Sequence, residues 1–223
     1  MSTPLLLPPS FWFRVALQAP FVERIVSPSG TVELPESCAL PPIGKLEADD
    51  RVSQSRVSVG WNESGIGFAV EFSGKPKSFT ASRANVRDSV DVCIDTRDTR
   101  DIHRASRFCQ RFSATVLREG RKHDPDVTLV QEAIPRALAD APQADLAKAV
   151  RHAEIQTQGW RLGLFFPSAC LHGFAPETNR RLGLMVRVMD PHRGMEYLGI
   201  ADLNFPMLDD PSLWATLELT GGA

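Results

Sequence analysis

Short stretches in which apolar and polar residues alternate recur along this chain, and this period of two constrains its fold more than any other feature. In residues 56–61, Val57, Val59 and Trp61 fall on one side of an extended chain, as in a strand with one buried face. Turn-forming residues separate such stretches about every 8–15 residues. The expected strands are 11–18, 56–61, 66–72, 89–95, 108–117, 127–134, 154–158, 160–166, 182–189, 198–201 and 213–219.

Composition agrees with a β-rich fold. The chain has 223 residues, including 17 prolines and 15 glycines, and this content argues against an all-helical bundle. Residues 143–151 alone have the Ala and Leu content of a helix, and no G-x-G-x-x-G loop follows a strand. The sequence therefore predicts an all-β fold, an antiparallel, jelly-roll-like β-sandwich with one short helix.

The apolar side chains that share the inner face of these strands should form the core. They are Val57, Val59, Trp61, Val90, Val92, Ile94, Trp160, Leu162, Leu164, Leu184, Val186, Val188 and Leu217.

A proline-rich stretch divides the chain into an arm and a main domain. Residues 19–50 contain prolines at 20, 28, 35, 41 and 42, and proline does not occur in central strands. We therefore expect residues 1–49 to form an N-terminal strand and an arm packed on the main domain, and residues 50–223 to form the sandwich.

Charge and cysteine content limit the partners and the compartment. The formal net charge is −2, so no overall field attracts nucleic acid or an anionic membrane. The N-terminus lacks the basic and apolar regions of a secretory signal, and the four cysteines form no CxxC pair. We expect a reducing, cytoplasmic location, with no nucleic acid or membrane partner.

The segment 96–107 is the main candidate for a functional loop. It joins two neighbouring strands with about twelve residues where a hairpin needs two to five, so we expect it to be ordered. Planar guanidinium groups bind carboxylate, phosphate or sugar hydroxyls. The candidate ligand-binding residues here are Arg97, His103, Arg104 and Arg107. The alternative is a loop whose Asp–Arg pairs neutralise one another and fix its shape.

Metal and catalytic motifs are weak in this sequence. Asp95 and Asp98 could help to hold calcium, but the chain has no D-x-[DN]-x-[DN]-G loop, no H-E-x-x-H and no G-x-S-x-G. We expect no cofactor, with calcium as the alternative. An enzyme that uses the 96–109 loop, with Cys109 as a thiol activated by His103 and Arg107, is the least favoured function.

Four segments in order give the chain a resemblance to a known family. They are the hairpin 57–72, the strand Asp88–Asp95 with its D-x-V-D-V-x-I-D pattern, the pair 159–167 and 181–190, and the closing segment 213–219. This order resembles the family 9 carbohydrate-binding modules and the related DOMON-like sandwiches, and the resemblance covers about residues 50–219.

The resemblance implies a non-catalytic domain that binds a saccharide or another polar ligand. Sugar readers of this family hold a sugar between aromatic rings. Trp61 and Trp160 alternate with apolar strand residues and are assigned to the core, whereas Trp12 and Trp214 lie opposite the more apolar face of their strands. These two are the candidate ligand platforms, or else lie buried under a second layer. The alternative function is a protein-interaction or scaffolding sandwich without a small-molecule site.

Overall fold

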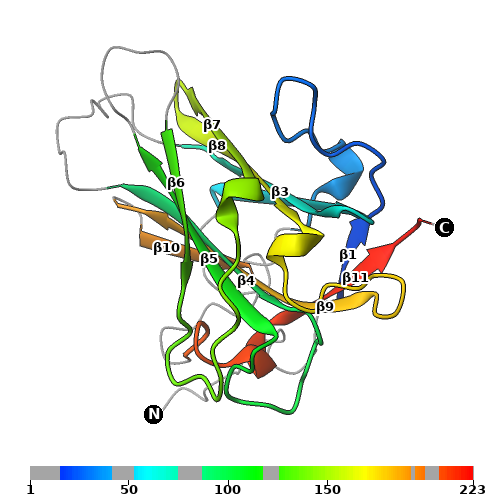
Figure 1. Ribbon diagram of the computed structural model, residues 1–223. Coiled ribbons are helices and arrows are strands. Elements are labelled where there is room, and N and C mark those ends of the chain that lie inside the picture. Colours follow the sequence, from blue (N-terminus) through cyan, green and yellow to red (C-terminus); the bar gives the residue numbers. More distant parts are fainter. Residues whose placement is uncertain are drawn as a thin grey trace, which may run out of the picture.

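Two β-sheets packed face to face form the molecule (Figure 1). The computed structural model describes residues 16–41, 53–74, 87–117, 126–191, 194–198 and 206–222. Within these residues, the larger sheet has seven strands in the order β1-β11-β9-β4-β5-β6, with β10 paired to β9, and the smaller has the order β2-β3-β8-β7. Neighbouring strands are antiparallel, except that β1 runs parallel to β11. The predicted antiparallel β-sandwich is confirmed.

The strands follow the sequence prediction closely. Their bounds are β1 (Ala16–Pro20), β2 (Ser55–Asn62), β3 (Gly65–Phe72), β4 (Asp88–Asp95), β5 (Cys109–Leu117), β6 (Asp126–Glu132), β7 (Val150–Gln156), β8 (Gly159–Pro167), β9 (Arg181–Asp190), β10 (Gly194–Leu198) and β11 (Ala215–Thr220). Of the strand expected at 198–201, Leu198 belongs to β10, and residues 199–201 lie outside the described residues. Residues 11–15 of the first predicted strand, Trp12 among them, lie outside the described residues.

The helix expected at 143–151 is wrong in extent. A single 3-10 turn, η3 (Leu146–Lys148), occupies this segment, and strand β7 begins at Val150. The N–H of Ala144 bonds to the side chain of Gln131, and β7 pairs along its length with β8. The sheet therefore satisfies backbone groups that a helix would satisfy locally, and this outweighs the helix propensity of Ala and Leu. In the described part of the chain, no helix is long and apolar enough to cross a membrane.

The core between the sheets consists of the predicted side chains. Each of the 13 apolar residues expected to be buried is buried. Aromatic rings add to the packing: Trp160 stacks on Phe72 with ring centroids 5.8 Å apart, and Phe112 stacks on Phe166 at 4.5 Å. Trp61 and Trp160 are thus core residues, as predicted.

Residues 21–41 cover the outer face of the smaller sheet. Gly67 has no side chain there because a Cβ would lie 2.5 Å from the side chain of Ile25, and a Cβ on Gly60 would lie 2.8 Å from Leu34. Ile25 and Val32 are buried in a cluster with Phe165. The boundary expected near residue 49 lies outside the described residues.

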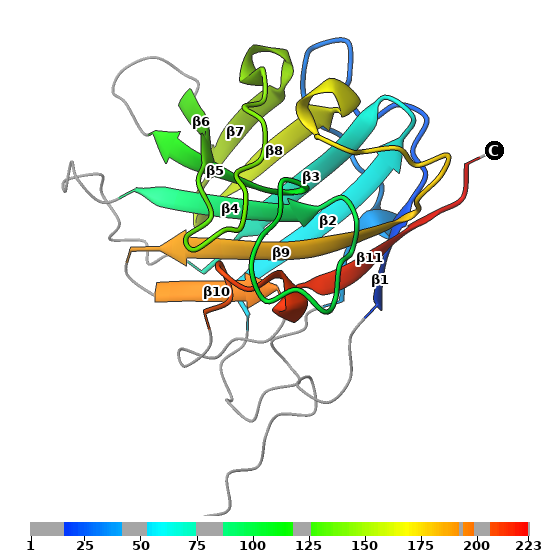
Figure 2. The same ribbon diagram turned by 60° about the horizontal axis from the view of Figure 1, so that its bottom comes forward.

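The outer face of the larger sheet is closed differently. The Asp91 carboxylate pairs there with the guanidinium groups of Arg111 and Arg187. Beside this pair lies a second apolar cluster, which is made of Cys93, Ala105, Cys109, Ile134, Met185 and Trp214. Figure 2 shows the β4–β5 loop and the segment before β11 crossing in front of this sheet. Loops rather than a continuous arm therefore cover this face.

Candidate functional site

The β4–β5 loop, residues 96–108, has a defined shape because the last residue of β4 holds its start. The Asp95 carboxylate accepts the N–H groups of Arg97 (2.9 Å) and Thr99 (2.7 Å), an arrangement that sets a turn. Burial raises the pKa of Asp95, and these two hydrogen bonds oppose the shift. At the far end, Cys109 begins strand β5, which pairs with β4.

The four loop residues predicted to bind a ligand do not converge on one point. Arg97 and Arg107 meet at the ring of Phe108, whereas His103 and Arg104 each contact a different neighbouring segment. The loop therefore contains three separate arrangements, which differ in how much of their hydrogen-bonding capacity is already used.

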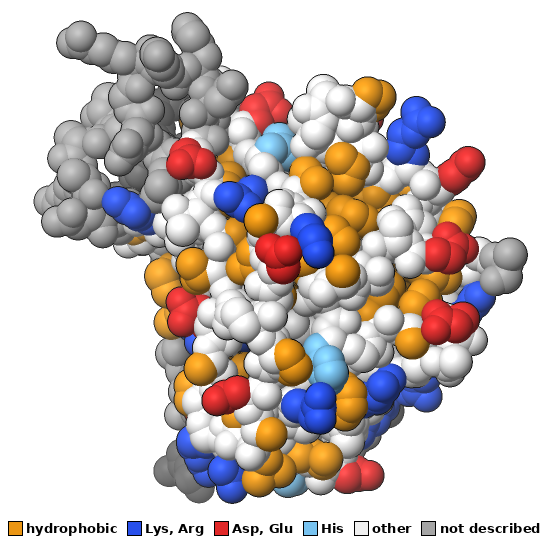
Figure 3. All heavy atoms as spheres, viewed as in Figure 1, with side chains coloured by type: hydrophobic (Ala, Val, Ile, Leu, Met, Phe, Trp, Pro, Cys, Tyr) orange, Lys and Arg blue, Asp and Glu red, His pale blue; other side chains and the backbone are white. Residues whose placement is uncertain are grey.

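Arg97, Phe108, His172 and Arg107 form the first arrangement, which we call the arginine–aromatic stack. The Phe108 and His172 rings stack at 5.2 Å with an interplanar angle of 13°. The guanidinium carbon of Arg97 lies 4.6 Å from the Phe108 centroid, and that of Arg107 lies at 5.8 Å. Both arginine side chains are exposed. In Figure 3, basic side chains gather beside a histidine in the lower part of the face shown.

His172 is fixed in place by its backbone. Its N–H donates to the Gln110 side chain (2.7 Å), and its carbonyl accepts the Thr96 hydroxyl (2.8 Å). Arg107 Nε lies 3.1 Å from His172 Nε2, and because guanidinium nitrogens only donate, this imidazole nitrogen accepts and the ring is neutral. Desolvation lowers the pKa of His172, as do the charges of Arg107 and Arg97.

Arg104 has a structural role in the second arrangement. Its guanidinium donates to the carbonyls of Arg136 (2.7 Å) and Ala137 (3.2 Å), and Leu138 N–H donates to the carbonyl of Ala105 at 2.7 Å. These bonds join the β4–β5 loop to the segment after β6, so the Arg104 side chain is committed to holding two loops together.

His103 belongs to the third arrangement, with Asp210 and Ser212. His103 Nδ1 lies 3.1 Å from Asp210 Oδ2 and 3.0 Å from Ser212 Oγ. In a Ser-His-Asp relay the acid and the nucleophile contact opposite ring nitrogens. Here both partners meet Nδ1, and Ser212 donates its proton to Asp210 at 2.6 Å. This geometry ties the loop to the 3-10 turn η5 (Pro211–Leu213) and offers no serine activation.

The calcium candidates Asp95 and Asp98 are occupied by protein donors. Asp95 binds backbone N–H groups, while Asp98 pairs with Arg100 (3.3 Å) and Arg181 (3.4 Å). Two adjacent guanidinium groups disfavour a divalent cation at the same carboxylate. Among the described residues, no group of three or more His, Cys, Asp or Glu side chains is arranged to hold a metal.

Trp214, one of the two platform candidates, is buried rather than exposed. It packs in the second apolar cluster, and its indole N–H donates to the Met207 carbonyl at 2.7 Å. Of the two alternatives left open by the sequence, burial under a second layer is the one observed. The other candidate, Trp12, lies outside the described residues.

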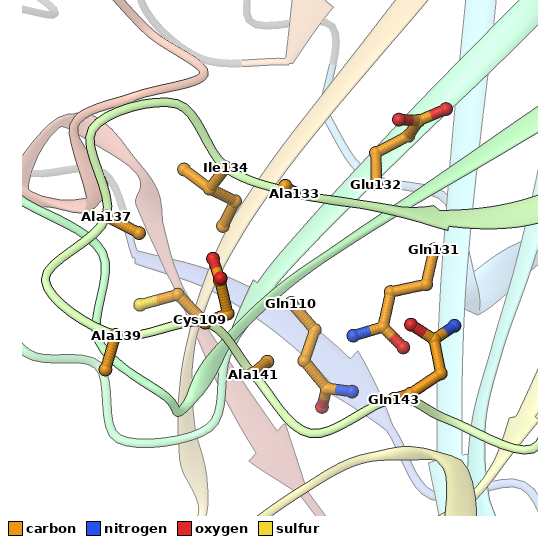
Figure 4. A pocket seen from close by; sticks show the side chains of 11 residues that line it. Cys109, Gln110, Gln131, Glu132, Ala133, Ile134, Ala137, Ala139, Ala141 and Gln143 are labelled. Atoms are coloured by element: carbon orange, nitrogen blue, oxygen red, sulfur yellow. The ribbon is translucent and has the colours of Figure 1, made fainter.

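A polar cavity that the sequence analysis missed lies beside the ends of β5 and β6. Its volume is about 180 Å³, and the segment that follows β6 curves around it (Figure 4). We call it the glutamine cavity. Its lining residues are Cys109, Gln110, Gln131, Glu132, Ala133, Ile134, Ala137, Ala139, Asp140, Ala141 and Gln143. These residues follow no sequence motif, because the cavity exists only once the 133–143 segment folds back on β5.

Backbone contacts fix the orientation of two carboxamides in this cavity. Gln110 donates to the Cys170 carbonyl (3.0 Å) and accepts the His172 N–H. Gln131 donates to the Pro142 carbonyl (3.1 Å) and accepts the Ala144 N–H (2.7 Å). A carboxamide has two N–H groups and two lone pairs, so Gln131 keeps one donor and one acceptor for a ligand. Gln110 is 1% exposed and belongs to the cavity wall, which it connects to the backbone of His172.

The Cys109 thiol in the cavity wall is not activated. Desolvation raises its pKa to about 11, so it is protonated at neutral pH and is not a nucleophile. All four cysteines are buried and unpaired. The activated thiol considered from the sequence is therefore not supported, because burial and the charge of Asp95 both raise the pKa of Cys109, while His103 and Arg107 contact Asp210 and His172 instead.

Comparison with solved structures identifies the fold. Two structures of a carbohydrate binding module family 9 domain from Caldicellulosiruptor kristjanssonii, one in complex with cellotriose and one with glucose, superpose on this chain with a TM-score of 0.58. They are 12% identical to it and cover 94% of its residues, which align with 95% and 97% of theirs. No protein-family model and no curated protein sequence match the chain. The chain thus has the fold of a family 9 carbohydrate-binding module.

Proposed function

We propose that this chain is a non-catalytic domain that binds a saccharide in the glutamine cavity. The observation that supports the proposal is the Gln131 carboxamide in the cavity, which two backbone bonds hold in place with one donor and one acceptor left over. A sugar hydroxyl both donates and accepts, so it matches such a group. Because the protein already orients this group, its side chain loses little further conformational entropy when a ligand binds.

Other side chains of the cavity suit the same ligand. Glu132, Asp140 and Gln143 line it and are exposed to solvent. Carboxylates accept hydrogen bonds from hydroxyl groups, and the bonds to a charged acceptor are the stronger ones. The structural neighbours that contain cellotriose and glucose have the same fold, which supports a saccharide as the ligand class.

A protein-interaction domain is the second candidate. The observation in its favour is Leu138, a residue that is 60% exposed on the segment that surrounds the cavity. Covering apolar surface removes it from water, which favours association with a partner. A protein partner would bury Leu138, so Leu138→Ser would weaken a protein contact and leave saccharide binding unchanged.

A saccharide screen followed by titration tests the main proposal. A glycan array identifies a ligand, and isothermal titration then measures its affinity for the wild-type chain and for Gln143→Ala and Asp140→Asn. We expect both variants to bind about tenfold or more weakly, since each loses a hydrogen bond to the ligand. Their melting temperatures should stay unchanged because both side chains are exposed.

The control variant is Gln156→Ala, in which an exposed glutamine of β7, away from the cavity lining, is removed. It should bind like the wild type. Two results would show that the cavity is not a saccharide site. One is the absence of binding to every saccharide in the array, and the other is wild-type affinity in both cavity variants.

A further inference from the structure

We infer that the arginine–aromatic stack is an anion-binding subsite that takes the carboxylate of an acidic saccharide. The inference rests on the proposed function, because it assumes a saccharide ligand, and it adds the chemical class of that ligand: a uronic acid rather than a neutral sugar. Four observations support it, and they concern the charge balance of the loop, the partners of the two arginines, their free donors and the neighbouring cavity.

The carboxylates of the β4–β5 loop leave Arg97 and Arg107 uncompensated. Asp95 is used by backbone N–H groups, and Asp98 is shared by Arg100 and Arg181. Within the described part of the chain, no carboxylate lies within 4 Å of the Arg97 or Arg107 guanidinium. Two exposed cations therefore lie against the same Phe108 ring without a counterion from these residues.

The groups that position these two arginines are neutral. Arg97 donates to the Gly173 carbonyl at 3.3 Å and lies over the Phe108 ring. Arg107 donates to the imidazole of His172, which the hydrogen bond requires to be uncharged. Such contacts orient the guanidinium groups without neutralising them, so their full charge is available to a ligand.

Many guanidinium donors remain free in this arrangement. Of the five N–H groups on each side chain, Arg97 uses one and Arg107 uses one in the contacts above. A planar fork of two N–H groups matches the two oxygens of a carboxylate, and the bidentate pair is stronger than a bond between neutral groups.

The charges that line the neighbouring cavity determine which end of a ligand would enter it. Glu132 and Asp140 line the cavity and repel a carboxylate, and the buried Gln110 in the cavity wall accepts the backbone N–H of His172, whose ring belongs to the stack. A sugar with hydroxyl groups at one end and a carboxylate at the other would thus place its hydroxyls in the cavity and its carboxylate on the arginines.

Esterification offers a direct test, because a methyl ester removes the charge of a uronic acid and keeps the sugar. Isothermal titration would compare trimers of galacturonate, glucuronate, mannuronate and guluronate with their methyl esters and with cellotriose, at 50 and 300 mM NaCl. We expect at least one acid to bind about tenfold or more tightly than its ester, with a weaker affinity at the higher salt concentration.

Matched variants assign the effect to the stack. Arg107→Gln and Arg97→Gln should each remove most of the preference for acid over ester. Arg24→Gln, which makes the same charge change at an exposed arm position, should keep that preference. Melting curves of all three variants show whether any loss of affinity comes from loss of folding.

Two negative results are distinguishable. If cellotriose or the esters bind as tightly as the acids, and Arg107→Gln keeps the wild-type affinity, the anion subsite is wrong and saccharide binding stands. If neither the acids nor the neutral sugars bind, the proposed function fails and the inference fails with it.

Discussion

The outer faces of the two sheets are closed by opposite means. Glycines of β2, β3 and β8 leave space on the smaller sheet, and apolar side chains of the arm fill it. On the larger sheet, Asp91 is paired with two arginines, and loops held by polar contacts lie over the rest. The first face is closed mainly by apolar packing of the arm against the sheet. The second combines an apolar cluster around Trp214 with hydrogen-bonded loops, and these loops carry both the glutamine cavity and the arginine–aromatic stack.

Removal of a large side chain from the core between the sheets should give the largest loss of stability. Trp160 is fully buried against Phe72, so Trp160→Ala should lower the free energy of unfolding by about 3–5 kcal/mol. Chemical denaturation measures this value. Trp160→Phe is the control: the indole N–H has no hydrogen-bond partner among the described residues, so its loss should add nothing to the cost of the smaller ring. A cost near zero for Trp160→Ala would place this side chain outside the core.

Removal of the Asp91 carboxylate from its ion pairs on the larger sheet should give the second-largest loss of stability. The Asp91 side chain is 3% exposed, and those of Arg111 and Arg187 are 16% and 15% exposed. Asp91→Ala leaves two arginines facing each other, which should cost about 3 kcal/mol, near the lower end for a broken buried pair because both arginines reach some solvent.

A triple variant tests whether charge is the cause. Replacing Asp91 by Leu together with Arg111 and Arg187 by Met removes all three charges and should recover most of the stability lost in Asp91→Ala. Urea denaturation of the three proteins gives the comparison. If the triple variant is as unstable as Asp91→Ala, packing rather than charge closes this face.

Overfilling the smaller sheet's outer face should cost somewhat less. A Cβ on Gly67 would lie 2.5 Å from the Ile25 side chain, so Gly67→Ala should lower stability by about 1–3 kcal/mol. In an Ile25→Ala background the same substitution should cost almost nothing, and the double-mutant cycle measures this coupling. Additive effects of the two substitutions would mean that the arm does not rest on this glycine.

A pH effect beneath the arm should be the smallest. His152 packs where a Cβ on Gly163 would lie 2.6 Å from its ring, and its Nδ1 is buried without a partner among the described residues. Desolvation, and then the charge of Arg161, lower the pKa of His152. As the pH falls, His152 therefore takes up its proton at a higher pH in the unfolded chain than in the folded protein. The free energy of unfolding should then fall as the pH drops below the ordinary histidine pKa of about 6.5.

The comparison protein for this effect is His152→Phe, which keeps a ring at the same place. Urea denaturation at pH 7.5 and 5.5 should show a smaller loss of stability in His152→Phe than in the wild type, since other titrating groups are common to both. An equal loss in the two proteins would show that His152 titrates as it does in the unfolded chain.

Sequence periodicity predicted the sandwich and its core because a strand with one buried face has an apolar residue at every second position. Val57, Val59 and Trp61 alternate with polar neighbours, and all three are buried. The helix at 143–151 was mispredicted because pairing with β8 is a non-local effect that local propensity does not contain.

The candidate site was only partly visible in the sequence. Its arginine-rich loop was identified, and Arg97 and Arg107 do lie together, but His172 and the cavity glutamines come from distant segments. Gln110 meets His172, from the segment after β8, only because the two sheets place their strand ends side by side. No spacing rule predicts such contacts, since they depend on how far each strand extends before its loop begins.

The parallel pairing of β1 with β11 has a consequence for how the protein is made. Residues 16–20 bond to residues 216–220, so β1 is synthesised long before the strand with which it pairs. Until then β1 is an unpaired edge, which is a hazard for association with other nascent chains. Closure of the larger sheet therefore depends on a contact between segments that lie far apart in the sequence, and a contact of such long range predicts slow folding.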